Sequence, residues 1–342
     1  MKTIRIGLLG MGTVGTGILK ILKENGEIIR ERQGLDLEIV RILVKDGCKA
    51  RKIEGVGEIL TTDPKDILND MNIDLLCECL SGEEPAFSSL MDALEKGISV
   101  VTANKSVVAK NWLKLEETAA KSGAGLYYEA SVGGAIPVIR AIENSLQANR
   151  IQRITGILNG TTNYILTRMS DEGMDYAEAL LEAQRLGYAE ADPAADVEGH
   201  DARNKLSILT ALAFRNWVRP ENIPCQGITA ITSADIKNAK DEGAVIKLLA
   251  ACESVDGKMA ASVKPVLIPK EHPLAGIRDS FNAVSIEGDM AGSLLFTGRG
   301  AGALPTASAM VSDMVTAALA EGNHPRRILD RKNQGTCEKN KG

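Results

Sequence analysis

The chain has 342 residues, too many for one compact core, and this length indicates two domains. A net charge of −5 and an aromatic content of 3% exclude the basic field and stacking surfaces that nucleic-acid partners need. The N-terminus shows no cleavable apolar segment, and no apolar run is long enough to span a membrane. Six cysteines have neither metal-ligand nor disulfide spacing. We therefore expect a cytoplasmic protein that binds a small molecule and neither nucleic acid nor membrane.

Up to about residue 130, short apolar strands alternate with amphipathic helices, as is typical of a doubly wound parallel sheet. The strands are expected at residues 4–9, 37–44, 73–80, 98–102 and 125–129. Between the first two, Val14, Ile18 and Ile21 share one face of a helix. The pattern predicts an α/β domain of the Rossmann type.

The pattern changes after Pro137, which suits the first turn of a helix reaching about residue 146. Asp175 and Glu178 have the spacing of an N-cap and its N3 partner, and Gly187 is placed to end the same helix. A further helix is expected at 201–214, and strands at 151–158, 263–268, 283–286 and 294–297, with an Asp256-Gly257 turn before the last three. This half predicts an α+β domain with a mostly antiparallel sheet.

The last expected helix, residues 307–320, follows a second glycine-rich turn and is expected to pack back on the first domain. We therefore predict a discontinuous dinucleotide-binding domain of residues 1–135 and 303–322. Residues 136–302 would form the substrate-binding and dimerisation domain. Residues 323–342 lack sustained periodicity and are expected to form a mobile tail.

A G-x-G-x-x-G motif follows the first strand directly and opens the first helix. Its glycines permit a tight turn, let the backbone approach a pyrophosphate and allow close packing of helix on strand. The free amides at the start of the helix then face the phosphates. The alternative is a tight structural turn that binds no nucleotide. The candidate nucleotide-binding residues are Gly10, Met11, Gly12, Thr13, Val14 and Gly15.

Charged residues follow the second strand, and they bear on the choice of nucleotide. An acid there would hold a ribose 2′-hydroxyl, whereas basic groups accommodate a 2′-phosphate. Both kinds are present, so NADP and NAD stay open, with the basic groups favouring NADP. A solvated basic loop is the alternative. The residues concerned are Lys45, Asp46, Lys49, Arg51 and Lys52.

Five carboxylates lie close together between residues 190 and 201. These carboxylates could bind a calcium ion, but their spacing is not that of an EF-hand. Asp201 and Lys205 are four residues apart on one helix face, a spacing that by itself is more typical of a surface ion pair than of a catalytic site. A second lysine, Lys105, follows a sheet strand at the edge where doubly wound folds bind ligands. A dehydrogenase needs a proton donor for the oxygen of the carbonyl that receives the hydride, and a partly desolvated lysine serves this role.

From Ala183 to Lys205 the sequence resembles the signature of homoserine dehydrogenases, with Asp192-Pro193 and Asp201 in place. One departure is Ala195, where many members have a second acid. Further matching stretches lie at 129–137, 156–164 and 298–308, and the resemblance runs from about residue 3 to 320. It implies reversible NAD(P)H-dependent reduction of L-aspartate 4-semialdehyde to L-homoserine, in the biosynthesis of threonine, methionine and isoleucine. Members with a C-terminal regulatory domain of the ACT type are common, and this sequence resembles a short form without it.

The resemblance also implies roles for individual residues. Lys205 would be the general acid in reduction and the base in oxidation, with Lys105 near the reacting oxygen and the nicotinamide. Glu190 and Asp201 would hold the polar groups of the substrate. The pocket would be completed by Asp196, Gly160, Thr161 and Tyr188, and further cofactor contacts would come from Lys45, Ser81, Lys105, Gly187, Glu190 and Gly302.

Glu129, with the carbonyls of Val132, Gly134 and Ile136, resembles the family's site for a monovalent cation, sodium or potassium. The alternative is a plain tight turn. The resemblance further implies a homodimer formed through the sheet of the second domain. Two other functions stay open: a dehydrogenase of another small amino acid, and a sensor that binds NAD(P) without turnover. Oxidation of L-homoserine compared with L-aspartate separates the first, and any turnover excludes the second.

Overall fold

The computed structural model describes residues 1–47, 56–255, 258–320, 324 and 327. The chain divides into two compact units. The first unit joins Met1–Ala135 to Gly302–Arg327, and the second consists of Ile136–Ala301. Within the described ranges, none of the helices combines the length and apolar character that crossing a membrane requires.

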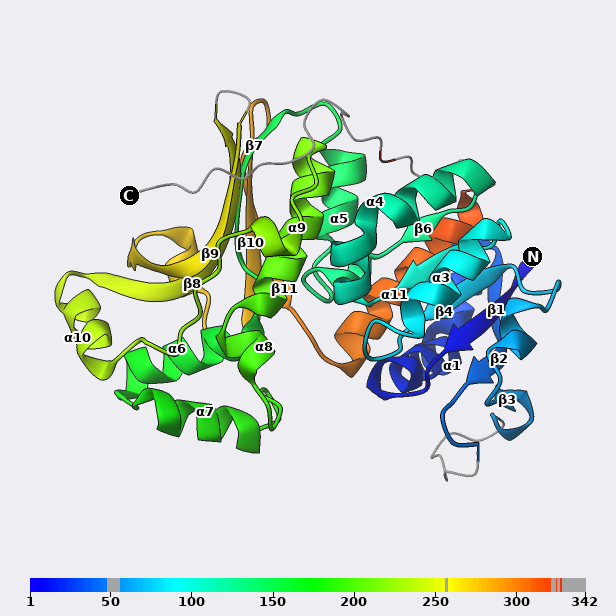
Figure 1. The fold of residues 1–342 in the computed structure, drawn as a ribbon, viewed down its shortest axis with the longest axis horizontal. Coiled ribbons are helices and arrows are strands. Elements are labelled where there is room, and N and C mark those ends of the chain that lie inside the picture. Colours follow the sequence, from blue (N-terminus) through cyan, green and yellow to red (C-terminus); the bar gives the residue numbers. More distant parts are fainter. Residues whose placement is uncertain (48–55, 256–257, 321–323, 325–326, 328–342) are drawn as a thin grey trace. The chain divides into compact units, whose positions relative to one another are not determined.

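The first unit is built on a six-stranded sheet in which every neighbouring pair is parallel (Figure 1). The prediction of a Rossmann-type sheet is confirmed. The strand order reverses beside β1, and such sheets bind ligands at the carboxyl ends of strands at this point. The two-residue strand β3 was not predicted, because so short a segment has no alternation to detect. The spatial order is β3 (Leu60–Thr61), β2 (Leu35–Leu43), β1 (Lys2–Leu9), β4 (Leu75–Glu78), β5 (Ser99–Thr102) and β6 (Leu126–Tyr127).

Helices cover both faces of this sheet, because right-handed crossovers run in opposite directions from β1. On one face α1 (Thr13–Gln33) packs against α11 (Ala303–Leu319), over buried residues of β1 and β2. The backbones approach so closely that a Cβ on Gly17 would lie 2.8 Å from the Ala303 carbonyl oxygen. The other face carries α3 (Ala86–Glu95) and α4 (Lys105–Ser122), and shorter helices are α2 (Lys65–Leu68), Gly57–Ile59 and Glu129–Ser131.

Helix α11 begins four residues earlier than the sequence predicted. Pro305 lies in its first turn, where backbone amides have no partner within the helix, so the missing N–H of proline costs nothing. The prediction had placed this proline outside the helix.

Two residues of the tail expected at 323–342 make contacts with the first unit. His324 and Arg327 belong to the first unit. Arg327 donates to Glu116 Oε1 at 2.7 Å, and its guanidinium carbon lies 4.5 Å from the centre of the Tyr128 ring. Both charged side chains are under 10% exposed. A local sequence pattern could not reveal this ion pair, because its partners are about two hundred residues apart.

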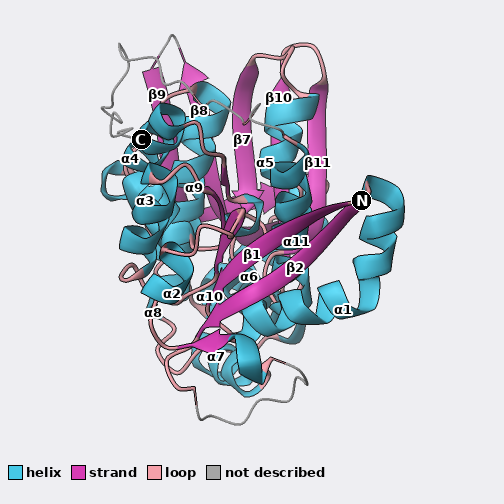
Figure 2. Cartoon of the chain, turned by 90° about the vertical axis from the view of Figure 1, so that its right-hand side faces the viewer, coloured by secondary structure: helices cyan, strands magenta, loops and turns pink. Residues whose placement is uncertain are grey.

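The second unit contains a five-stranded antiparallel sheet, whose strands are drawn in magenta in Figure 2. The prediction of an antiparallel sheet is therefore confirmed. Strand β8 was missed because its apolar run is nearly continuous, and such a run does not distinguish a strand from a buried helix. The expected turn at 256–257 lies outside the described residues. The spatial order is β11 (Gly292–Arg299), β10 (Phe281–Gly288), β7 (Ile151–Ile157), β8 (Ala244–Val255) and β9 (Lys258–Pro269).

In the second unit, the helix after Asp175 has the predicted caps, whereas the segment after Pro137 departs from the predicted helix. Asp175 and Glu178 form the expected capping box, and Gly187 takes a left-handed conformation just after the helix, with φ of 78°. After Pro137, however, a short α-helical turn passes into a π-helical turn, Ala141–Ser145. The helices are α5 (Val138–Arg140), α6 (Gly160–Glu172), α7 (Tyr176–Arg185), α8 (Ala194–Val197), α9 (His200–Phe214) and α10 (Ser233–Asp241), with short 3₁₀ turns at Pro220–Asn222 and Pro273–Gly276.

The buried ion pair of Arg327 yields a first prediction. Arg327→Met should lower the unfolding free energy of the first unit by about 3 kcal/mol, because it leaves the Glu116 carboxylate buried without its cation. The matched control is Lys20→Met, which removes an exposed pair with Glu24 and should cost about 0–1 kcal/mol. Urea unfolding of Trp217→Phe variants reports on this unit through Trp112, which donates to the Tyr128 hydroxyl at 2.8 Å. Equal midpoints for the two variants would contradict the assigned role of Arg327.

Candidate active site

The candidate nucleotide-binding loop begins where β1 ends. Gly10 has φ of 104°, a conformation that side chains rarely tolerate. A Cβ on Gly15 would lie 2.2 Å from the Gly10 carbonyl oxygen, whereas one on Gly12 would meet no protein atom within 4 Å. A different constraint therefore explains each glycine: Gly10 allows the turn, Gly15 allows the close contact with the Gly10 carbonyl, and Gly12 leaves open space for a ligand. The residues present fit a dinucleotide, because the first amides of α1 have no partner within the helix and are available to its phosphates.

The ends of β4 and β5 lie beside this loop in the same sheet. Asn104 caps α4 by accepting the Val107 N–H at 3.3 Å and donates to the Gly82 carbonyl at 2.7 Å. It therefore ties the turn before Lys105 to the loop that contains Ser81. Lys105 is half-buried as the first residue of α4. The structure thus brings Ser81 and Lys105 to the carboxyl edge of the sheet that also carries the glycine loop.

Lys45 is exposed just beyond β2, beside Asp46. The other basic residues expected to accommodate a 2′-phosphate, at 49, 51 and 52, lie outside the described residues.

Glu78 is a buried acid at this edge that the sequence analysis missed. It is fully buried as the last residue of β4. Its Oε1 accepts the Leu80 N–H at 2.6 Å, and its Oε2 accepts the Thr102 hydroxyl at 2.5 Å. Burial raises the pKa of the Glu78 carboxyl to about 7, against the lowering effect of these hydrogen bonds. The available signal was a charge near the end of the apolar strand expected at 73–80, whose other charged residue is Asp74.

In the second unit, α9 carries a buried lysine and carboxylate one turn apart. Lys205 Nζ donates to Asp201 Oδ2 at 2.7 Å and to the Leu158 carbonyl at 2.6 Å. The two residues are only 6% and 4% exposed. This burial excludes the surface ion pair that the spacing alone allowed.

Asn159, which the sequence analysis did not select, links the carboxylates. It caps α6, and its Nδ2 donates to Asp196 Oδ1 at 2.7 Å and to Asp201 Oδ2 at 2.9 Å. The Thr161 hydroxyl lies 2.9 Å from Asp196 Oδ2 and 2.7 Å from the Tyr188 carbonyl, and its single proton is shared between these two acceptors. The start of α6, where Gly160 is its first residue, therefore fixes two carboxylates beside a buried ammonium group. Such a cluster can bind a polar substrate and exchange a proton with it.

Not every residue expected in the pocket joins this cluster. Glu190 is exposed, and in the described part of the chain its carboxylate makes no hydrogen bond or ion pair. The ring of Tyr188 is 40% exposed and lies 4.8 Å from the ring of Tyr164, centre to centre. Gly187 ends α7 through its own backbone hydrogen bonds. Among the described residues, no group of three His, Cys, Asp or Glu side chains is placed to hold a metal, so nothing supports calcium at the acidic loop.

The loop expected to hold a cation begins with a buried acid. Glu129 is 5% exposed, and its N–H donates to Asp313 Oδ2 on α11 at 2.8 Å. Val132 is buried, and Gly134 has φ of 58°. Ile136 is the first residue of the second unit. The backbone turns sharply here, as both a cation loop and a plain turn require.

A glycine loop at the switch point of a doubly wound sheet and a buried lysine–carboxylate pair define an NAD(P)-dependent oxidoreductase. Comparison with known proteins narrows this class. The family model described as homoserine dehydrogenase matches residues 137–315, and the model of its NAD-binding domain matches residues 10–129. The chain therefore belongs to the homoserine dehydrogenase family.

Curated relatives and solved structures of homoserine dehydrogenases match this chain over most of its length. The chain is 46% identical to homoserine dehydrogenase of Corynebacterium glutamicum over 323 residues, which are 93% of this chain and 72% of that protein. It is 43% identical to the Bacillus subtilis enzyme, over 92% of this chain and 73% of the relative. A homoserine dehydrogenase structure from Thiobacillus denitrificans superimposes with a TM-score of 0.90 at 39% identity, covering 99% of this chain and 79% of that one. The chain thus has homoserine dehydrogenase activity, the NAD(P)-dependent interconversion of L-homoserine and L-aspartate 4-semialdehyde.

The contrast between two glycines of the loop gives a prediction. Gly15→Ala should lower the melting temperature of the apoprotein and weaken NADPH binding at least about tenfold, because its Cβ would collide with the Gly10 carbonyl. Gly12→Ala meets no protein atom, so the apoprotein should keep nearly its normal stability while the methyl group hinders a bound pyrophosphate. Thermal unfolding and fluorescence titration with NADPH measure the two effects. Normal stability of Gly15→Ala would refute the packing argument.

Proposed function

We propose that Lys205 exchanges the proton in the homoserine dehydrogenase reaction. The observation that supports this role is its burial, with Nζ bonded to Asp201 Oδ2 at 2.7 Å. Asp201 stabilises the ammonium form by its charge, and the Leu158 carbonyl fixes the direction of Nζ. A lysine held in this way is positioned before the substrate arrives, so little reorganisation is needed during the reaction.

Each direction of the reaction balances with this assignment. In reduction, a bound NADPH or NADH would supply the hydride that the aldehyde carbon of L-aspartate 4-semialdehyde receives. The Lys205 ammonium gives a proton to the aldehyde oxygen, which becomes the hydroxyl of L-homoserine. In oxidation the neutral amine takes the hydroxyl proton as the hydride leaves the same carbon.

We propose that the carboxylates around Lys205 bind the polar groups of the substrate. Asp196 and Asp201 are held by Asn159, and Asp196 is also held by Thr161, so both are fixed as acceptors for an ammonium group. Glu190 is exposed on the loop after α7, its carboxylate makes no hydrogen bond in the described part of the chain, and it would contact substrate and cofactor. Lys105 would lie near the reacting oxygen and the nicotinamide.

We propose NADP as the preferred cofactor. Lys45 is exposed beyond the end of β2, where a 2′-phosphate is recognised in this fold. A hyperthermophilic archaeal homoserine dehydrogenase, with a TM-score of 0.78 at 28% identity over 95% of this chain, was solved in complex with NADPH. Kinetics with both cofactors test the choice: a lower KM for NADPH supports it, and a lower KM for NADH contradicts it.

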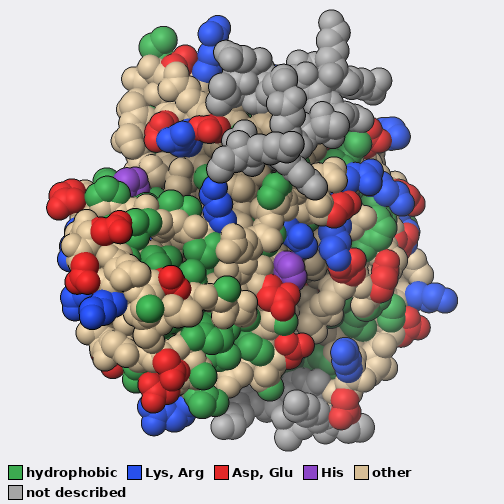
Figure 3. All heavy atoms as spheres, turned by 60° about the vertical axis from the view of Figure 1, so that its left-hand side comes forward, with side chains coloured by type: hydrophobic (Ala, Val, Ile, Leu, Met, Phe, Trp, Pro, Cys, Tyr) green, Lys and Arg blue, Asp and Glu red, His purple; other side chains and the backbone are tan. Residues whose placement is uncertain are grey.

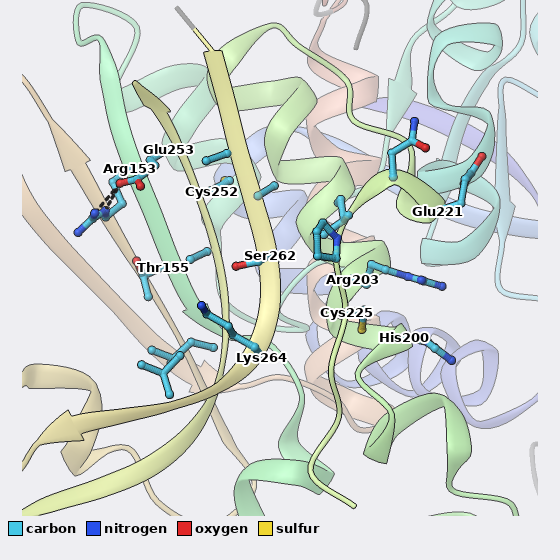
Figure 4. A pocket seen from close by; sticks show the side chains of 18 of the residues that line it. Arg153, Thr155, His200, Arg203, Glu221, Cys225, Cys252, Glu253, Ser262 and Lys264 are labelled. Atoms are coloured by element: carbon cyan, nitrogen blue, oxygen red, sulfur yellow. Dashed lines mark hydrogen bonds and ion pairs between the residues drawn. The ribbon is translucent and has the colours of Figure 1, made fainter. Parts of the chain in front are cut away.

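We propose a homodimer formed through the sheet of the second unit. Alternate residues on β7, β8 and β9 differ in burial: Ile154, Cys252 and Val263 are buried toward α9, whereas Thr155, Ala251 and Ser262 are half-exposed. The half-exposed face borders a hollow of about 1100 Å³ that also contains the Arg153–Glu253 ion pair (Figure 4). None of the residues expected to bind substrate lines this hollow. It therefore suits a protein partner, and a second copy is the one that the resemblance implies.

We propose that the enzyme is cytoplasmic and that it binds no nucleic acid. The described cysteines are all free thiols, as expected in a reducing compartment. On the face drawn in Figure 3, acidic and basic side chains are interspersed, so the coloured part of that face offers no extended basic field to a phosphate polymer.

Lys205→Met should lower kcat by about 10²- to 10⁴-fold, which is the usual contribution of positioned acid–base catalysis. Its control is Lys247→Met, because Lys247 is also a buried lysine of the second unit but donates to Asn163 and the Ile277 carbonyl instead. The control variant should lose stability and keep kcat within a few-fold of normal. Steady-state oxidation of L-homoserine measures both variants. If they lose turnover equally, the effect is one of folding and Lys205 has no special role.

Monovalent cations should raise the melting temperature or the activity if Glu129 helps to bind one. The buried carboxyl and the sharp turn after it supply the hard oxygen ligands that such ions prefer. Sodium, potassium and a bulky organic cation are compared at constant ionic strength. A response to a small cation that disappears in Glu129→Gln supports the site. Identical behaviour in all three salts favours the plain turn.

A further inference from the structure

Glu78 and Thr102 are the last residues of neighbouring parallel strands and lie opposite one another. Both side chains are fully buried. Among the described residues, no lysine, arginine or histidine forms an ion pair with Glu78. Burying a carboxyl without a cation is costly, so its hydrogen bonds have to compensate for that cost.

The hydrogen bonds of Glu78 form a directional chain. The Asn104 N–H donates to Thr102 Oγ1 at 2.9 Å, and the Thr102 hydroxyl donates to Glu78 Oε2 at 2.5 Å. The second oxygen of Glu78 accepts the Leu80 N–H at 2.6 Å. Together with the side-chain bond from Asn104 to the Gly82 carbonyl, the chain joins the loop after β4 to the turn after β5. Lys105 follows that turn directly.

We propose that Glu78 is a positioning residue for Lys105, and that its carboxylate fixes the turn of residues 102–104 from which Lys105 starts α4. The inference rests on the proposed role of Lys105 near the reacting oxygen. Glu78 acts through Thr102 and Asn104 and touches neither substrate nor nicotinamide in this account.

Only the ionised form of Glu78 satisfies the whole chain. A protonated Glu78 would donate to Thr102 Oγ1, which already accepts from Asn104, and the Thr102 hydrogen would lose its acceptor. The charge state depends little on other groups. The thiols of Cys77 and Cys79 on the same strand have raised pKa values and stay neutral, and α11 contributes Asp313, which acts on Cys77. The pKa of Glu78, about 7, therefore places the change of charge near neutral pH.

The decisive variant is Glu78→Gln, whose amide must donate to Thr102 and so imitates the protonated acid at every pH. Wild-type kcat/KM for L-homoserine should fall as the pH drops through about 7. Glu78→Gln should lack this step, and at pH 8 it should be about 10- to 100-fold less active, as expected for a misplaced catalytic group. Thr102→Val should show the same loss, and Thr102→Ser should restore activity. An unchanged pH profile in Glu78→Gln, or normal activity in Thr102→Val, would overturn the proposal.

Glu116→Gln is the matched control, because Glu116 is another buried carboxyl of the same unit, bonded to Tyr128 and Arg327. It should lose stability but retain the step near pH 7. The variant Lys105→Met distinguishes the proposed role of Lys105 from the positioning role of Glu78. If Lys105→Met is fully active, the proposed role of Lys105 is wrong. If Lys105→Met is impaired and Glu78→Gln is normal, only the positioning role fails.

Thermal unfolding of the apoprotein provides a readout without turnover. The pKa of the carboxyl is about 7 in the folded chain against an ordinary value of 4.5, so the folded state binds more protons between these values. The stability of the wild type relative to Glu78→Gln should therefore fall as the pH rises from about 4.5 to 7 and stay constant above 7. A difference in melting temperature that does not vary over this window would show that Glu78 does not titrate there, and the proposal would fail.

Discussion

The ion pair between Lys205 and Asp201 is the constraint around which the substrate half of the molecule is organised. Two opposite charges are almost completely removed from water, so further hydrogen bonds to them are needed to offset the cost of desolvation. The Leu158 carbonyl and the Asn159 amide provide those bonds at the junction of β7 and α6. The antiparallel sheet and α9 carry the elements that meet at this junction, so the fold of the second unit fixes the position of Lys205 Nζ.

The nucleotide half obeys a different constraint, the approach of backbone to backbone. Gly15 touches the Gly10 carbonyl, and Gly17 touches Ala303 of α11, a helix nearly three hundred residues away in the sequence. Close packing of this kind leaves the first amides of α1 at the carboxyl edge of the sheet. Glu78 extends the same edge, because its hydrogen bonds join the ends of β4 and β5. The proposed phosphate binding and the proposed placement of Lys105 thus depend on one row of strand ends.

Local signals allowed much of this to be predicted from the sequence. The glycine motif, the capping box at Asp175 and the i, i+4 pair of Asp201 and Lys205 are all written within a few residues, and each was recognised. What was missed depends on partners that are distant along the chain. Asn159 gains its importance from Asp196 and Asp201, and Arg327 from Glu116. β8 escaped recognition because its nearly continuous apolar run does not distinguish a strand from a buried helix.

The central claim is that Lys205 exchanges its proton with the oxygen of the reacting carbon. A crystal structure with L-homoserine and NADP⁺ bound tests this most directly. The account predicts that the homoserine hydroxyl lies within about 3 Å of Lys205 Nζ, the distance that proton transfer requires. A homoserine hydroxyl beyond hydrogen-bond reach, with Lys205 still bonded only to Asp201 and the Leu158 carbonyl, would contradict it.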